Sequence, residues 1–283
     1  GMNKDLLKSL INIKKKYDIN EIVKKINLIS KLKILIIGET IIDEYIYVSP
    51  LGKPSKEDIL ASLYNSKKKF LGGLFASVNI LSRFTNNIDF ITVVNKDKKE
   101  FDFVKKNLPK NLNKKMFFFD KRPTTTKSRF VQDNYFKVKK IYEYYKMEDH
   151  PISKAIESSI LKKLNQNIRK YDLIIVNDYG HGLMTNRIIS KLQTSKKFLS
   201  VTSQINAGNQ GFNLITKYKK ANYYCLDRSE ALKALENNDV TLHTKITARI
   251  KNFTGEFTKI ETTPGRMILA DCLPLNENIN FEM

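Results

Sequence analysis

The stretch at residues 33–43, KILIIGETIID, most constrains what this chain can fold into. The apolar run at 34–37 is short and rich in β-branched residues, which is typical of a central parallel strand covered on both faces. Gly38 then lets the backbone turn, and Asp43 follows five residues later. Because ligands in open α/β sheets lie just beyond the carboxyl ends of such strands, we expect Asp43 to face a ligand. The alternative is that this carboxylate caps a helix or accepts a bond from a loop amide.

Length and composition indicate a globular α/β chain. With 283 residues and 41% apolar content, it can form one large domain or two smaller ones around a sizeable core. No apolar run approaches the roughly 20 residues that span a bilayer, and the lysine-rich N-terminus lacks the apolar core of a secretory signal. The two cysteines, Cys225 and Cys272, have no ligand-like spacing and suggest reduced thiols. We therefore expect a cytoplasmic protein without a membrane partner.

The net charge of +21 and the isoelectric point near 9.7 would ordinarily favour a nucleic acid or an anionic membrane as partner. Lysine greatly outnumbers arginine here, and isoleucine and asparagine are abundant. An AT-rich genome produces this composition on any solvated protein surface. We therefore interpret the charge as solvated surface and expect no nucleic acid partner. A basic cleft would also suit a phosphorylated ligand.

The chain alternates strand and helix patterns, the βαβ rhythm of a parallel sheet. Residues 4–31 place apolar side chains at helical spacing, which predicts two amphipathic helices that separate near Asp18 and Asn20 and pack on the domain that follows. After the strand at 34–37, the pattern predicts strands at 90–94, 173–176, 198–202 and 223–226, with helices at 76–84, 152–169 and 186–194.

Two segments interrupt this rhythm with β patterns of their own. Between residues 44 and 70, prolines, a glycine and short alternating apolar runs fit short strands or a lid better than a helix. In residues 126–145, two β-rich runs flank the turn pair Asp133-Asn134, which predicts a hairpin that projects from the sheet.

Four strand ends or turns present polar groups or glycines in chain order: Asp43, Gly72-Gly73, Asp178, and Asp227 with Glu230. With the motifs around them, residues 32–230 resemble the ribokinase-like (phosphofructokinase-B) carbohydrate kinases, and within these the heptose-phosphate kinase type. The motifs that carry the resemblance are GETIIDEY at 38–45, LGG at 71–73, RPTTTKSR at 122–129, NDYGHG at 177–182 and LDRSE at 226–230. The resemblance implies a three-layer α/β sandwich with a mainly parallel central sheet and a β lid.

The resemblance also implies a substrate site. In that family the carboxylate that matches Asp43 holds sugar hydroxyls, and the turn at Gly72-Gly73 lets backbone amides approach the sugar without a Cβ in the way. Lys127 and Arg129 become candidates for a sugar-borne phosphate, because charge-assisted bonds to phosphate are strong. The alternative is that both are ordinary solvated strand residues.

The lid, which the resemblance assigns to about 45–70 and 126–145, is the part through which such kinases often form a homodimer. Asp178 would complete the substrate side, unless it and Gly180 form only an Asx-type turn at a strand end. His181 follows in the same motif, but the family uses no histidine there, and we interpret it as a loop residue.

ATP and Mg²⁺ are the cofactors that the resemblance implies. Asn206, Asp227 and Glu230 would bind the nucleotide, and Asp227 with Glu230 would hold magnesium, since a carboxylate can hold a magnesium-bound water. The alternative is that Asp227 caps a helix whose Glu230 completes a capping box, with no metal. The chain departs from its relatives where Asp227 and Ala76 replace asparagines, and where the Asn- and Gln-rich stretch at 204–213 replaces an Asp-Pro-Lys type of segment.

The sequence lacks the Gly-Ala-Gly-Asp segment that in this family supplies the catalytic base and the donors for the migrating phosphoryl group. We therefore assign no catalytic residue. Residues 231–283 instead resemble a stretch of the bacterial RNA polymerase β′ subunit, through LHTKITAR at 242–249 and TTPGR at 262–266. The hypothesis that follows is a chimera, in which a foreign tail truncates the kinase near 228–236.

These expectations define three segments: amphipathic helices at 1–31, a sugar kinase domain at 32–230 and an atypical tail at 231–283. At family level the expected function is ATP-dependent phosphorylation of a sugar or sugar phosphate, with little or no activity in this chain. The alternative is a non-catalytic module that binds sugar phosphate, or a chimeric fragment whose basic surface binds nucleic acid.

Overall fold

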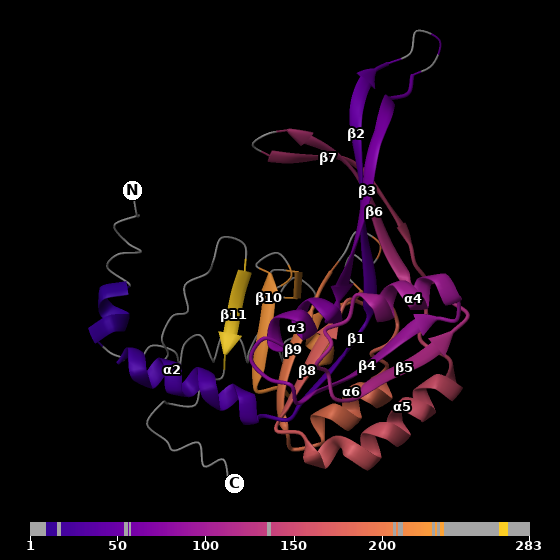
Figure 1. Ribbon diagram of the computed structural model, residues 1–283. Helices are drawn as coiled ribbons and strands as arrows, with labels where there is room; N and C mark the ends of the chain where they lie inside the picture. The colour runs from indigo at the N-terminus through magenta and orange to yellow at the C-terminus, as the bar shows by residue number, and fades with distance from the viewer. Residues whose placement is uncertain are drawn as a thin grey trace.

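The chain folds into an α/β sandwich from which a second, smaller sheet projects (Figure 1). The structure is a computed structural model, and the residues it describes are 10–15, 18–53, 56, 58–134, 137–205, 208, 212–227, 230, 233–234 and 266–270.

The sandwich is built on a seven-stranded sheet in the order β11-β10-β9-β8-β1-β4-β5. The predicted buried strand, β1 (Ile34–Gly38), lies between β8 and β4 and is parallel to both. The other strands are β4 (Ile88–Asn95), β5 (Lys115–Asp120), β8 (Leu173–Asp178), β9 (Phe198–Ser203), β10 (Tyr223–Asp227) and β11 (Arg266–Ala270). All described neighbours in this sheet pair in parallel except β10 and β11, which are antiparallel.

Helices cover both faces of this sheet, which explains why β1 is apolar at every position. Ile34 and Ile36 belong to a buried cluster with α3 and α4, whereas Leu35 and Ile37 belong to a second cluster with α5 and α6. Alternate side chains of a strand point to opposite faces, so each face of β1 meets its own helix layer. The helices are α3 (Leu74–Leu81), α4 (Lys98–Lys106), α5 (Lys154–Asn167) and α6 (Asn186–Gln193), with short 3-10 helices η1 (Ile29–Lys31), η2 (Ile168–Lys170) and η3 (Ile215–Lys217). The predicted fold class is confirmed.

Sequence patterning missed α4 and β5. Val104 is the buried residue of α4, whose sequence KKEFDFVKK is mostly charged. β5 is the edge strand, and its side chains are half-buried or exposed. The mostly charged sequence of α4 gives only a weak apolar pattern, whereas the apolar run at 116–119 in β5 does indicate a strand, and sequence analysis overlooked it.

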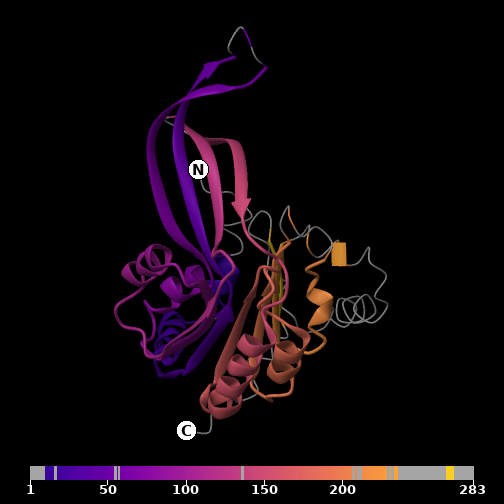
Figure 2. The same ribbon diagram turned by 90° about the vertical axis from the view of Figure 1, so that its right-hand side faces the viewer.

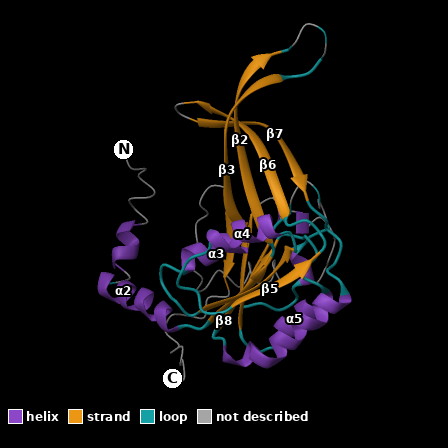
Figure 3. Cartoon of the chain, turned by 45° about the vertical axis from the view of Figure 1, so that its right-hand side comes forward, coloured by secondary structure: helices purple, strands orange, loops and turns teal. Residues whose placement is uncertain are grey.

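The lid is a separate sheet in the order β3-β2-β6-β7. β2 (Thr40–Gly52) follows β1 after the single residue Glu39 and leaves the sandwich at the carboxyl edge of the central sheet (Figure 2). The other lid strands are β3 (Ala61–Gly73), β6 (Thr125–Asn134) and β7 (Lys137–Lys146). β6 and β7 pair as the predicted hairpin, and Figure 3 shows all four strands rising together from the helical layers.

Helix α2 (Ile19–Leu28) is capped by Asp18, whose side chain accepts a bond from the Asn20 amide, and this cap lies where the sequence predicts two amphipathic helices to separate. The expectation that this helix packs on the domain that follows is wrong for its described residues. None of them is buried, and Ile19, Val23 and Ile26 are between 43 and 66% exposed. Helical periodicity predicts an apolar face, but it does not identify what covers that face.

Of the tail at 231–283, the structure describes residues 233–234 and 266–270. Through β11, this tail adds an antiparallel edge strand to the central sheet. The stretch at 242–265, which carries most of the resemblance to the RNA polymerase subunit, lies outside the described residues, so the chimera remains a prediction. Among the described helices, none has the length and apolar character needed to cross a bilayer.

Candidate functional site at the base of the lid

The candidate site lies on one face of the lid, close to where β2 leaves the sandwich. Asp43 of β2 is opposite Phe70 of β3 and Lys127 of β6, and Tyr45 is opposite Arg129. Side chains two residues apart on a strand share a face, so these residues line the same side of the lid. The fold therefore brings Asp43, Lys127 and Arg129, which are far apart in sequence, to one surface.

Arg129 is already occupied by two carboxylates. Its Nη1 donates to Asp43 Oδ1 at 2.6 Å and its Nε donates to Glu143 Oε2 at 3.1 Å. Burial disfavours the charged guanidinium, but the hydrogen bond and charge of Asp43, together with the charges of Tyr45 and Glu143, outweigh it and raise the pKa of Arg129. This arginine positions Asp43, and its charge is balanced before any ligand arrives.

Gly72 and Gly73 are required by the close approach of the chain around them. A Cβ on Gly72 would lie 2.1 Å from Asp43 Oδ2, so the glycine makes room for the carboxylate. Gly73 has a φ of 62°, and a Cβ there would lie 2.1 Å from the Glu39 carbonyl oxygen. This backbone conformation favours glycine, and it allows α3 to begin at Leu74, whose amide bonds to that same carbonyl.

Lys127 is a buried cation, 7% exposed, beneath the pocket face of the lid. Its ammonium lies 5.7 Å from the centroid of the Tyr145 ring, and burial lowers its pKa. In the described part of the chain, no carboxylate lies within ion-pair distance of it. A buried charge without a paired carboxylate is costly, and an anionic ligand would offset that cost.

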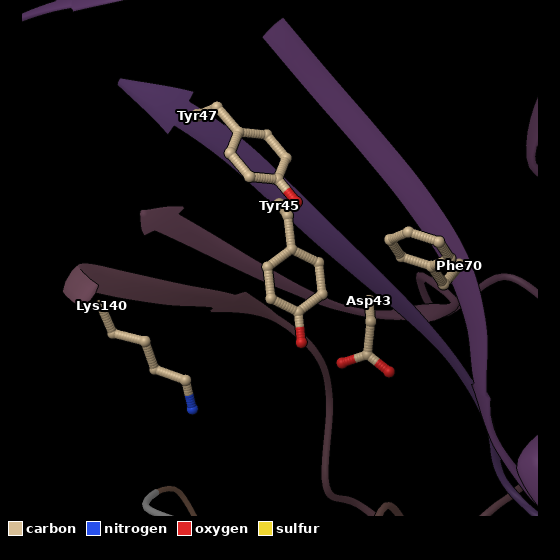
Figure 4. A pocket seen from close by; sticks show the side chains of 5 residues that line it. All are labelled: Asp43, Tyr45, Tyr47, Phe70 and Lys140. Carbon is tan, nitrogen blue, oxygen red and sulfur yellow. The ribbon is translucent and has the colours of Figure 1, made fainter. Parts of the chain in front are cut away.

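Asp43 borders an open pocket of about 500 Å³ (Figure 4). It is lined by Asp43, Tyr45, Tyr47, Phe70 and Lys140. The Tyr45 and Phe70 rings pack edge to face, with centroids 5.9 Å apart. Sequence analysis missed the three aromatic residues and Lys140.

Asp178, at the carboxyl end of β8, is fully buried. Its Oδ2 accepts bonds from the Tyr218 hydroxyl at 2.5 Å and the Lys217 ammonium at 2.6 Å. Its Oδ1 accepts a bond from the Gly180 amide at 3.0 Å, which is the turn that the sequence left open as an alternative. Burial and the neighbouring Asp178 hold the pKa of Tyr218 well above its usual value.

Glu39, which sequence analysis also missed, occupies the single position between β1 and β2. Its Oε2 accepts a bond from the Tyr179 amide at 2.9 Å and its Oε1 accepts one from the His181 amide at 3.3 Å. Burial, with the nearby Asp178 carboxylate, raises the pKa of Glu39 to about 7. The sequence signal that could have identified Glu39 is its position directly after Gly38, at the carboxyl end of the buried strand β1.

His181 is a loop residue, as expected, but it is buried. Its Nδ1 is 2.8 Å from Asp149 Oδ1, and burial lowers its pKa. The loops are fixed by Arg122, which donates to the carbonyls of His150, Pro151 and His181. These bonds assign His181 a structural place, beside a separate small cavity that Glu39 and Arg122 also line.

The predicted nucleotide and magnesium residues are described only in part, so their role stays a prediction. Both Glu230 oxygens are held by backbone amides, Oε2 by Asp227 at 2.8 Å and Oε1 by Ile205 at 3.1 Å, which matches the capping role left open by the sequence. Asn206 lies outside the described residues. Across the described ranges, no cluster of three His, Cys, Asp or Glu residues could hold a metal ion.

Solved structures define the class of fold. Giardia lamblia ribokinase matches with a TM-score of 0.52 and 14% identity, covering 79% of this chain and 71% of that chain. Escherichia coli phosphofructokinase-2 matches with a TM-score of 0.51 and 11% identity, covering 78% and 68%. The chain has a ribokinase-like carbohydrate kinase fold. No protein-family model matches it.

Curated relatives point to a particular kind of protein. The bifunctional protein HldE of a Nitratiruptor species is 28% identical over 214 residues, which cover 72% of this chain and 42% of that protein. HldE of Aliarcobacter butzleri is 24% identical over 210 residues, with the same shares. The chain therefore spans about two fifths of the length of these relatives.

Proposed function

We propose that this chain binds a sugar or sugar phosphate in the pocket at the base of the lid. The related reaction is ATP- and Mg²⁺-dependent phosphorylation of a hydroxyl of that ligand. One observation carries the proposal: Asp43 is fixed by Arg129 against the side-chain-free surface of Gly72, at the mouth of an aromatic pocket. Similarity to HldE proteins supports a phosphorylated sugar as the ligand class.

Each residue has a defined task in this proposal. Asp43 Oδ2, which has no hydrogen-bond donor among the described residues, accepts a hydroxyl of the sugar. Arg129 holds Oδ1 of the same carboxylate and so fixes its orientation. Charge-assisted bonds of this kind are about twice as strong as neutral ones, which favours a hydroxylated ligand over an apolar one.

We further propose that the chain alone turns over little or no ATP. Phosphoryl transfer needs a base near the attacking hydroxyl and donors for the migrating group, and the Gly-Ala-Gly-Asp segment that supplies both in this family is not in the sequence. Loss of such groups costs roughly two or more orders of magnitude in rate.

A thermal-shift experiment tests binding directly. We expect sedoheptulose 7-phosphate to raise the melting temperature and MgATP to leave it unchanged, because a ligand that binds only the folded state stabilises it. Asp43→Asn should remove the sugar shift, whereas Asp58→Asn, an exposed lid residue, should keep it. A chain that no sugar stabilises contradicts the binding proposal, and steady ADP release from MgATP with sugar phosphate contradicts the low-turnover proposal.

We also propose a homodimer formed through the lid face opposite the pocket. Tyr142 and Tyr144 are 61% and 43% exposed there, with ring centroids 6.1 and 6.4 Å from Phe130. Exposed aromatic groups of this kind are typical of protein interfaces. Light scattering after size exclusion should give twice the 32.8 kDa chain mass, and Tyr142→Lys should lower it, while Asp58→Asn in the exposed loop between β2 and β3 does not. A monomer from the unchanged protein would refute this assembly.

A further inference from the structure

The pocket face of the lid hairpin is set by its register near the sandwich. In β7, Tyr145 is opposite Lys127 and Glu143 is opposite Arg129. Tyr145 and Glu143 therefore share the face that carries Asp43. Strict alternation beyond Glu143 would place even-numbered residues of β7 on the other face of the lid.

A β-bulge changes this alternation. Tyr142 is opposite Phe130, but the next pair is Lys140 with Val131, so Ile141 is an extra residue on β7. An extra residue re-aims the side chains beyond it. Lys140 is thereby turned onto the pocket face, and it is one of the residues that line the pocket.

Lys140 and Asp43 bring opposite charges to one cavity. Figure 4 shows the Lys140 side chain extending into the same space as Asp43, with the Tyr45 ring between them. The cavity of about 500 Å³ falls in the range of roughly 300–1,000 Å³ that is usual for small-molecule sites. Its two charged ends suit a ligand with hydroxyls at one end and an anion at the other.

Among the described residues that line the pocket, Lys140 is the cation. Arg129 is bound to Asp43 and Glu143, and Lys127 is buried under the Tyr145 ring. Lys140 is exposed and, within the described part of the chain, makes no hydrogen bond or ion pair. An anionic group entering the pocket therefore meets Lys140 without first breaking an existing ion pair.

The wall between the charged ends is aromatic and fixed. Tyr45 packs against Phe70 and lies under the Arg129 guanidinium, 5.6 Å from its ring centroid. Tyr47 is capped by the Lys68 ammonium at 5.4 Å. Aromatic side chains of this kind supply a large, rigid apolar surface on which the carbon face of a sugar can rest.

We propose that Lys140 binds the anionic group of an elongated carbohydrate phosphate whose hydroxyl end lies at Asp43 and whose carbon face lies on Tyr45. This assignment rests on the proposed function and adds to it the residue that binds the phosphate group. It also predicts a preference for length, because the ligand must reach from Asp43 past the Tyr45 ring to the ammonium.

Calorimetric titration at low ionic strength tests the proposal. The probes are ribose 5-phosphate, mannose 6-phosphate, sedoheptulose 7-phosphate and unphosphorylated mannose, each titrated into the unchanged chain, Lys140→Gln and the matched control Lys139→Gln. Lys139 is the exposed neighbour on the same strand, and alternation directs it to the other face. We expect Lys140→Gln to weaken sedoheptulose 7-phosphate roughly five- to tenfold, to weaken ribose 5-phosphate less, and to leave mannose unchanged.

The outcomes separate this assignment from the proposed function. Equal affinity of Lys140→Gln and the unchanged chain for every phosphate would overturn the assignment while leaving sugar binding intact. An equal loss with Lys139→Gln would show a general charge effect and would also overturn it. If the unchanged chain binds none of the four probes, the proposed function fails and the role of Lys140 falls with it.

Discussion

At the scale of single residues, the site depends on which charges are already satisfied. Asp43, Lys127 and Arg129 were expected from the sequence to act as separate substrate contacts. The structure joins Asp43 and Arg129 in one ion pair and places Lys127 beneath a tyrosine ring. Motifs predicted that Asp43 and Arg129 belong to the site and lie on strands. Their ion pair could not be predicted, because it depends on the register between two strands whose paired residues are 86 positions apart in sequence.

Gly72 gives the sharpest residue-scale prediction. Gly72→Ala should destabilise the fold by about 1–3 kcal/mol and weaken sugar binding, because the new Cβ would push the Asp43 carboxylate away from Arg129. Urea unfolding and calorimetric titration measure the two effects.

Gly52→Ala is the matched control for this substitution. Gly52 has a φ of 99°, and no atom lies within 4 Å of the place that an added methyl group would take. Alanine there should therefore cost about 1–2 kcal/mol of backbone strain and leave affinity unchanged. If Gly72→Ala keeps full sugar affinity, the close packing of Gly72 on Asp43 has no role in binding.

At the scale of elements, apolar patterning predicted what is deeply buried. The strands β1, β8 and β9 and the helices α5 and α6 were all expected, since their cores carry clear periodic signals. α4 was missed because Val104 is its one buried side chain, whereas the apolar run at 116–119 in β5 was overlooked. Patterning therefore follows burial, and it loses elements at the periphery of the sandwich.

The lid hairpin shows a second limit of patterning. Its existence followed from the turn pair and the β-rich runs, but the bulge at Ile141 follows from no turn or periodicity signal. Alternation alone would have directed Lys140 away from the pocket. The structure is needed to place it, which is why the phosphate contact was assigned in the sequence to Lys127 and Arg129 and is proposed here for Lys140.

At the scale of the whole molecule, polar groups meet where the lid joins the central sheet. Glu39, between β1 and β2, and Asp178, at the end of β8, are both buried there. Lys217 and Tyr218 bind Asp178, whereas Glu39 accepts two backbone amide bonds. The junction between the lid and the central sheet thus contains Glu39, a carboxyl group whose burial opposes its ionisation.

The titration of Glu39 predicts how the stability of the protein depends on pH. Its pKa is raised in the folded state from 4.5 to about 7, so the folded protein binds a proton that the unfolded chain releases. This contribution to stability is complete below about pH 4.5 and is lost as pH rises through about 7. By linkage it amounts to about 3 kcal/mol, with stability falling as pH increases across that window.

Urea unfolding at several values between pH 5 and pH 8 measures this slope, and Glu39→Gln isolates the contribution of Glu39 because an amide does not titrate. We expect the variant to lose most of the decline, while Glu21→Gln on the exposed helix α2 keeps it. The absolute stability of Glu39→Gln is a poorer guide. The Glu39 carboxyl group accepts bonds from the Tyr179 and His181 backbone amides, and the NH₂ group of glutamine cannot accept either bond. Parallel profiles of unfolding free energy against pH for Glu39→Gln and the unchanged protein would mean that ionisation of Glu39 costs no stability. Ionisation at the junction would then not couple the lid to the stability of the sandwich.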